Sequence, residues 1–180
     1  MNIDEISDDV MSVMDQIEYG YKDANGDNII DTDQFGEHYR LQSPGELLDS
    51  KVGVCWDQVE LERKLFIDRG VNVKTYFIFI DDEDMLPSHT FLTYEFGGKY
   101  YWFEHSFAKY TGVHKYKSEE ELLTDAVRKF RDYQNLTNLD APMYLFRYQR
   151  PEYHIGVDDF YKYIETQAEI NLGDDSVRQI

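Results

Sequence analysis

The sequence predicts a single α+β domain of residues 1–180, in which helices pack against an antiparallel sheet. Three observations predict this class. Residues 73–80 form an unbroken β-branched and aromatic run, and residues 89–96 and 99–107 form two strand-like runs on either side of Gly97-Gly98. Helical periodicity occurs both before and after these runs. A Gly-Gly pair between two strand patterns indicates a tight hairpin, so the last two strands are expected to be antiparallel.

The chain is expected to begin with an amphipathic helix, because apolar residues recur at spacings of three and four from Ile3 to Ile17. Residues 23–34 then resemble an EF-hand calcium loop in their oxygen side chains. They lack the central glycine, which is Asn28 here, and the final glutamate, which is Gln34. A hairpin with Asn25-Gly26 at its tip accounts for the same residues, so no tight calcium binding is expected. The segment from Phe35 makes a poor helix start.

Two helices are expected in the next region. Ser43-Pro44-Gly45-Glu46 has the cap, the proline and the acidic first turn that begin a short helix. Gly53 gives the backbone room to turn, and a longer helix starts at Cys55 and ends at Gly70. The charged residues of this longer helix are expected to form a solvated surface with helical charge pairing; they are Glu60, Glu62, Arg63 and Lys64.

The remaining elements follow from local signals. The acidic residues 81–84 are expected to be a loop after the first strand, although such a cluster could also bind a cation. Ser118 and Glu121 form a capping pattern that opens another helix. Residues 142–148 have the pattern of a strand, residues 157–165 that of a closing helix, and residues 171–180 that of a frayed tail.

Composition limits the possible partners and the compartment. The chain has 36 acidic and 18 basic residues and a formal net charge of −18, which argues against nucleic acid and anionic membranes as partners. This acidity either favours cationic substrates or simply gives a solvated surface. One cysteine excludes an internal disulfide framework, and no secretory signal or bilayer-spanning run is visible, so a cytoplasmic protein is expected.

The single cysteine lies in the stretch Gly53-Val54-Cys55-Trp56-Asp57-Gln58, where a loop becomes a helix. The unpaired N–H groups and the dipole of a helix start favour a thiolate over a thiol. Cys55 is therefore a candidate nucleophile. The alternative is that Cys55 is a small, inert core residue, since buried cysteines commonly are.

The hairpin supplies candidate partners for this thiol. With Gly97-Gly98 as a two-residue turn, Phe91 lies opposite Glu104, and His89 and Glu104 share one face of the sheet as diagonal neighbours. A helix that carries Cys55 and packs on this face would complete a Cys-His-Glu triad. His105 would point to the other face.

These motifs resemble the transglutaminase-like superfamily of thiol enzymes. The matching features are Gly53-Val54-Cys55-Trp56 at a helix start, His89 at a strand start, and the acidic Glu104 in the next strand. The resemblance covers roughly residues 44 to 107 and implies a papain-like architecture, with the helix that carries the cysteine packed on an antiparallel sheet. The family usually has aspartate where this chain has Glu104.

Other site residues are expected to have minor roles. His38, His105, His114 and His154 are read as structural or surface residues. His38, His114 and His154 are expected to lie in loop-like segments. No metal is expected, because Cys55 and the histidines lack short ligand spacings. The N–H of Cys55 is the first candidate oxyanion donor. Gln42 or Trp56 is the candidate second donor, and Trp102 is a candidate residue of the substrate cleft.

The resemblance implies acyl transfer at an amide through a thioester on Cys55, with His89 as base and then acid and Glu104 orienting it. Water as the acceptor would make the protein a cysteine peptidase or amidase, which is the expected function, and an amine acceptor would make it a transglutaminase. A non-catalytic module that binds peptides on the same fold is the alternative. The expected partner is a protein or peptide amide and no cofactor is expected, while the oligomeric state is left open.

Overall fold

The computed structural model describes residues 2–23, 25–30, 35–82 and 86–172 of the chain. Within these residues, the centre of the fold is a six-stranded sheet with the order β10-β9-β5-β6-β7-β8 and antiparallel pairing throughout. The predicted α+β class with an antiparallel sheet is confirmed. The strands of this sheet are β5 (Val73–Ile80), β6 (Ser88–Phe96), β7 (Lys99–Glu104), β8 (Gly112–Tyr116), β9 (Met143–Tyr148) and β10 (Ala168–Glu169).

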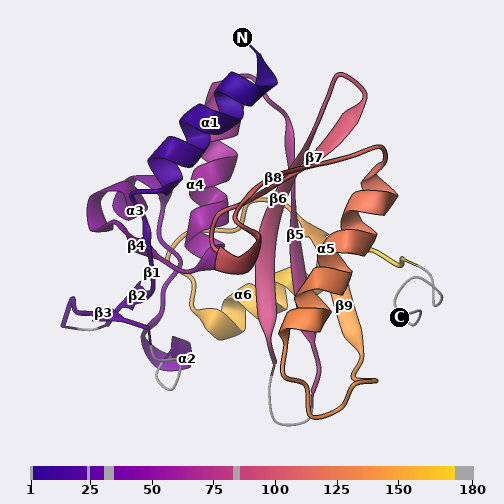
Figure 1. Cartoon of the computed structure of the whole chain (residues 1–180). Coiled ribbons are helices and arrows are strands. Elements are labelled where there is room, and N and C mark those ends of the chain that lie inside the picture. The colour runs from indigo at the N-terminus through magenta and orange to yellow at the C-terminus, as the bar shows by residue number, and fades with distance from the viewer. Residues whose placement is uncertain (1, 24, 31–34, 83–85, 173–180) are drawn as a thin grey trace.

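Helices cover both faces of the sheet (Figure 1). On one side lie α1 (Ile3–Met14), α3 (Pro44–Ser50) and α4 (Cys55–Asp68), and on the other side lies α5 (Glu119–Tyr133). The closing helix α6 (Val157–Glu165) packs beside the start of α4, since the rings of Phe160 and Trp56 stack with centroids 4.0 Å apart.

The shorter elements lie in the connections. They are β1 (Glu18–Tyr19), which pairs in parallel with β4 (Val52–Gly53), the hairpin of β2 (Tyr21–Lys22) and β3 (Asn28–Ile29), the helix α2 (Phe35–His38) and the 3₁₀ helix η1 (Ala108–Tyr110).

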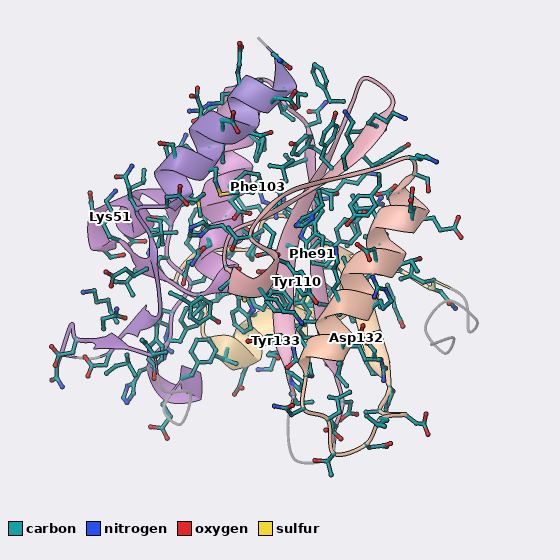
Figure 2. All side chains as sticks on the ribbon, in the orientation of Figure 1. Lys51, Phe91, Phe103, Tyr110, Asp132 and Tyr133 are labelled. Carbon is teal, nitrogen blue, oxygen red and sulfur yellow. The ribbon has the colours of Figure 1, made fainter. Side chains whose placement is uncertain are left out.

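Each face of the sheet has its own core, because successive residues of a strand point to opposite faces. Phe103 of β7 packs on the α4 side, where its ring centroid lies 5.1 Å from that of Phe66. Phe91 of β6 and Trp102 of β7 pack on the α5 side with Phe130. Figure 2 labels Phe103 and Phe91 on these two sides.

The hairpin register is confirmed. Phe96 pairs with Lys99, and the ladder continues to Leu92 with Phe103. Gly97 and Gly98 have φ values of 59° and 70°, which L side chains rarely adopt, so two glycines suit this turn.

The region of the EF-hand-like pattern is partly described. β2 and β3 form the predicted hairpin, with Lys22 paired to Asn28 and Gly26 in the connecting loop. Oδ1 of Asp23 accepts the N–H groups of Asn25 at 2.8 Å and Asp27 at 2.9 Å, and the bond from Asp27 is the largest cause that lowers the pKa of Asp23. This carboxylate therefore closes the turn of the hairpin. Residues 31–34, which include the end of the EF-hand-like pattern, lie outside the described residues.

Two local expectations were wrong. The segment from Phe35 is the one-turn helix α2, because the ring of Phe35 stacks on that of Tyr39, with centroids 4.6 Å apart, and tertiary packing supports a turn that local propensity disfavours. His114 lies in the edge strand β8 and not in a loop. Pairing of Trp102 with His114 and of Glu104 with Gly112 gives β8 its structure without a strongly apolar pattern.

The expectation that the charged residues of α4 are solvated was also wrong for three of them. Glu60, Glu62 and Arg63 are buried. Arg63 donates from Nε and Nη2 to the two carboxylate oxygens of Glu60, at 3.0 and 3.1 Å, and also donates to Oγ1 of Thr75 in β5. The sheet and its neighbours cover α4 on more sides than an amphipathic pattern indicates, and inside the protein Glu60 and Arg63 pair with each other.

We predict that Arg63→Met destabilises the fold by about 3–5 kcal/mol, because it leaves the Glu60 carboxylate buried without its partner. Lys64→Met is the matched control. It removes the neighbouring ion pair with Asp68, which is half exposed at both ends, and should cost less than about 1 kcal/mol. Urea unfolding measures both changes. The double variant Arg63→Met with Glu60→Leu should recover most of the loss, and equal effects of Arg63→Met and Lys64→Met would show that the buried pair is not special.

Candidate active site

Cys55 is the first residue of α4, and only the N-cap residue Val54 separates it from the two-residue strand β4. Its N–H group belongs to the first turn, where no carbonyl of the helix can accept it. The residue is 6% exposed and packs among aromatic side chains from α2, α4, α6 and the sheet, including Trp56 and Phe77. The predicted placement of the thiol at a helix start is confirmed.

The carboxylate of Asp57 fixes the loop before Cys55. Its Oδ1 accepts the hydroxyl of Tyr39 at 2.9 Å and the N–H of Gln42 at 2.8 Å, and its Oδ2 accepts the N–H of Val54 at 3.0 Å. Asp57 is fully buried, and this burial raises its pKa to about 7 although all three donors act in the opposite direction. This one side chain therefore links the segment of Tyr39 and Gln42 to Val54 and to the first turn of α4. We call the residues just before Cys55, Val52 to Val54, the nucleophile loop.

Gly53 is required at this loop by close packing and not by its backbone angles. A Cβ at residue 53 would lie 2.6 Å from Cδ1 of Leu47 and 2.9 Å from Cβ of Asp57. The sequence suggested instead that Gly53 allows a turn. Its real contribution is to let α3 and α4 approach the chain between them.

His89 and Glu104 form the predicted contact. Nε2 of His89 lies 2.8 Å from Oε2 of Glu104, and both side chains are buried, with 8% and 2% exposure. The longer glutamate side chain therefore reaches the imidazole across the diagonal of the hairpin.

Three further donors hold the Glu104 carboxylate in place. Nε1 of Trp102 donates to Oε2 at 3.2 Å, and Oε1 accepts the hydroxyl of Ser106 at 3.2 Å and the N–H of Phe107 at 2.8 Å. With His89, all four donors come from β6, from β7 or from the turn that follows β7. Trp102 is 1% exposed, so the structure places it behind Glu104 and not at the surface of a cleft.

His89 interacts with Cys55 as well as with Glu104, since both residues contribute to its pKa. Nε2 of His89 is occupied by Glu104. Burial alone would lower the pKa of His89, but the charge of Glu104 and the hydrogen bonds with Cys55 and Glu104 outweigh it and raise this pKa to about 10. At neutral pH the imidazole is therefore protonated between a carboxylate and the sulfur.

The way in which α4 meets this pair differs from the sequence prediction. We expected α4 on the same face of the sheet as His89 and Glu104, but α5 covers that face, where the ring of Phe130 lies 6.2 Å from that of His89. Strands β6 and β7 pair from Leu92 to the turn, so His89 lies before the part of β6 that pairs with β7, and β7 ends at Glu104. The start of α4 therefore reaches His89 at the rim of the sheet, beyond the end of β7.

The other histidines lie outside this cluster. Nδ1 of His105 lies 2.6 Å from Oε1 of Gln58 on α4, which agrees with its predicted direction away from Glu104. Burial is the main cause that lowers the pKa of His105. His114 contacts the carbonyl of Tyr110 through Nε2, His154 contacts Glu46, and His38 is a half-buried residue of α2.

The two candidates for a second oxyanion donor have other contacts. Nε2 of Gln42 donates to the carbonyl of Val52 at 2.8 Å, and its Oε1 accepts the hydroxyl of Ser50 at 2.8 Å. The Trp56 ring is 3% exposed and stacks on Phe160. The structure therefore uses the side chains of Gln42 and Trp56 to build the walls around the nucleophile loop.

Tyr19 is a residue that sequence reasoning missed. Its strand β1 pairs with β4 so that Tyr19 lies beside Gly53, two residues before Cys55, and its side chain is 49% exposed. The charge of Cys55 is the largest cause that raises the pKa of Tyr19, followed by burial and by the charges of Asp57 and Glu104. This hydroxyl therefore lies in the electrostatic field of the site. A two-residue parallel bridge leaves no readable pattern in the sequence, so no local signal could have identified Tyr19.

The described residues contain neither a metal-binding cluster nor a membrane-spanning helix. No group of three or more His, Cys, Asp or Glu side chains in this part of the chain is placed to hold a metal ion. None of the helices within the described ranges is both long enough and apolar enough to cross a bilayer.

No known protein-family model matches this chain, and no curated protein is significantly similar to it.

We predict that Asp57→Asn destabilises the fold by about 1–3 kcal/mol at pH 6. One carboxylate oxygen becomes an amide NH₂ group, which cannot accept the hydrogen bond that this oxygen accepts in the wild type. Since the pKa of Asp57 rises to about 7 on folding, wild type loses stability between roughly pH 4 and pH 7, whereas the variant does not titrate. The difference between them should therefore shrink as the pH rises. Denaturant unfolding from pH 5 to pH 8 measures it, and a difference that grows with pH would contradict the assignment.

Proposed function

We propose that this protein is a thiol-dependent acyl-transfer enzyme that acts on amides, with Cys55 as nucleophile, His89 as general acid and base, and Glu104 as the residue that orients His89. The observation that carries the proposal is the chain of contacts from Cys55 through His89 to Glu104, in which the imidazole is held as a cation. We further propose that α4 and the hairpin form a papain-like core of the transglutaminase-like superfamily.

In the first half of the reaction, the sulfur of Cys55 attacks the carbonyl carbon of a peptide or side-chain amide. The C=O π electrons move to oxygen, and the resulting oxyanion accepts the N–H of Cys55. Collapse of this intermediate breaks the C–N bond. His89 gives its proton to the leaving nitrogen, so an amine departs and a thioester remains on Cys55.

In the second half, the neutral imidazole of His89 takes a proton from the acyl acceptor as that acceptor attacks the thioester. Water as acceptor yields a carboxylic acid and restores the thiolate and imidazolium. We propose hydrolysis, as in a cysteine peptidase or amidase, as the main reaction. An amine acceptor would give a new amide by the same steps, as in a transglutaminase.

Tyr19 supplies the second oxyanion donor in this proposal. Its phenol is in the field of Cys55, belongs to a half-exposed residue paired beside Gly53, and has no carboxylate partner among the described residues. A phenol that remains protonated because anions surround it is a hydrogen-bond donor throughout the working pH range.

We predict that Glu104→Gln slows alkylation of Cys55 by iodoacetamide at least about tenfold at neutral pH, because the imidazolium loses its anionic partner. Mass spectrometry of the alkylated chain follows the reaction without ambiguity, since Cys55 is the only cysteine. His105→Gln is the matched control at the adjacent position and should change the rate by less than about twofold. Loss of reactivity in His105→Gln with normal reactivity in Glu104→Gln would remove Glu104 from the site.

We predict that Tyr19→Phe slows acylation of Cys55 by p-nitrophenyl acetate by about ten- to a hundredfold, because acylation forms an oxyanion. Alkylation by iodoacetamide forms no oxyanion and should be unchanged. Release of p-nitrophenolate and the mass of acetylated Cys55 report the first reaction. If Tyr19→Phe slows both reactions equally, Tyr19 acts on the thiol and not on the oxyanion. If wild-type Cys55 is alkylated readily but never acetylated, the acyl-transfer proposal fails.

A further inference from the structure

A pocket whose lining does not include Cys55 lies beside the residues that hold the loop before α4. It has a volume of about 550 Å³ and is formed by the β2–β3 hairpin, the end of α2, the segment that follows it, α3 and the loop before α6. Its size is in the range of small-molecule sites. Four of its lining residues are basic, namely Lys22, His38, Arg40 and His154.

This gathering of basic residues is unusual in a chain with 36 acidic and 18 basic residues. Neither Lys22 nor Arg40 forms an ion pair with any carboxylate of the described residues. His154 is different, because it contacts Glu46 through Nε2 at 2.9 Å. Two permanent cations therefore face the pocket without a described counter-ion, although acidic side chains outnumber basic ones twofold.

The guanidinium of Arg40 is held in a fixed position. Its Nη1 donates to the carbonyls of Tyr39 at 2.6 Å and Glu37 at 3.2 Å. Its other face lies against Gly156, where an added Cβ would be 3.3 Å from Nη1. Its Nε and Nη2 make no hydrogen bond to any described residue, and these two nitrogens form the edge that binds carboxylate or phosphate through two parallel bonds.

The opposite wall of the pocket has a different character. Glu46 and Asp49 of α3 line it, and hydrogen bonds from Ser43 are the main cause that lowers the pKa of Glu46 to about 2. Both carboxylates therefore repel a second anionic group and accept hydrogen bonds from a neutral or cationic one. A ligand that fits both walls has an anion at one end and hydroxyl or ammonium donors at the other.

We propose that this pocket binds a small molecule whose carboxylate or phosphate lies on the free edge of Arg40 and near Lys22, and whose donors face Glu46 and Asp49. The ligand would also contact Tyr39 and Gln42, which line the pocket and bind Asp57. It would therefore touch the residues that hold the loop of Cys55. The binding site itself does not depend on the chemistry proposed for Cys55.

Isothermal titration calorimetry with two probes tests the proposal and separates the two anion classes. Glycerol 3-phosphate carries a phosphate with hydroxyl donors, and L-serine carries a carboxylate with an ammonium donor. At least one should bind saturably below about 10 mM, and glycerol, which lacks the anion, should not bind. The net charge of −18 disfavours non-specific anion binding, so saturation would indicate a formed site.

Variants locate the binding. Arg40→Lys keeps the charge but loses the two-bond edge, and should weaken binding about tenfold or more; Lys22→Ala should weaken it about fivefold. Lys99→Ala, at the distant β6–β7 turn, is the control and should bind as wild type does. Circular dichroism and thermal melting without ligand verify that each variant is folded. The proposal is overturned if neither probe binds saturably, or if folded Arg40→Lys and Lys22→Ala both bind like wild type.

Discussion

The arrangement of the site depends first on the buried carboxylate of Asp57. Its three hydrogen bonds connect the ends of two loops to the first turn of α4, and no other single side chain in the described structure is shown to join these segments. Asp57 is the third residue of the helix, so the same bond to Val54 that fixes the loop also satisfies one of the free N–H groups at the helix start. The position of the Cys55 sulfur is thus determined by a residue that takes no part in the proposed chemistry. Burial raises the pKa of Asp57 to about 7, which shows that removing this carboxylate from water costs free energy. The three hydrogen bonds offset part of that free-energy cost.

The contact between His89 and Glu104 places a second titratable group in the core. Its pKa is raised like that of Asp57, but protonation gives the imidazole a charge whereas it removes the charge of a carboxylate. The pKa of His89 is raised from 6.5 to about 10, so its contribution to stability is complete below about pH 6.5 and is lost as the pH rises through 10. The contribution of Asp57 is complete at lower pH and is lost as the pH rises through 7. Both groups therefore favour the folded state under mildly acidic conditions. The raised pKa of His89 therefore favours the protonated imidazole over the same mildly acidic range.

The sequence predicted well those features that local chemistry determines. The strand over residues 73–80, the closing helix over residues 157–165, and the hairpin register set by Gly97-Gly98 agree with the structure, because strand alternation and turn type leave little freedom. The same alternation of side chains along the two hairpin strands predicted the contact of His89 with Glu104. It could not show which helix covers that face, since an antiparallel hairpin offers both faces equally. It also could not identify Tyr19, whose place beside Gly53 depends on a pairing between segments more than thirty residues apart in the sequence.

Glu62 shows why the charges of α4 had to be read in three dimensions. It is buried and forms no hydrogen bond or ion pair with the described residues, and burial followed by the charge of Glu104 raises its pKa well above the usual range. This raised pKa favours the uncharged form of Glu62, and the nearby charge of Glu104 acts in the same direction as burial. Oγ1 of Thr90, on the face of β6 that α4 covers, is also buried without a hydrogen-bond partner among the described residues. Thr90 and Glu62 are therefore buried polar groups in or beside α4, and the raised pKa of Glu62 limits the negative charge close to Glu104.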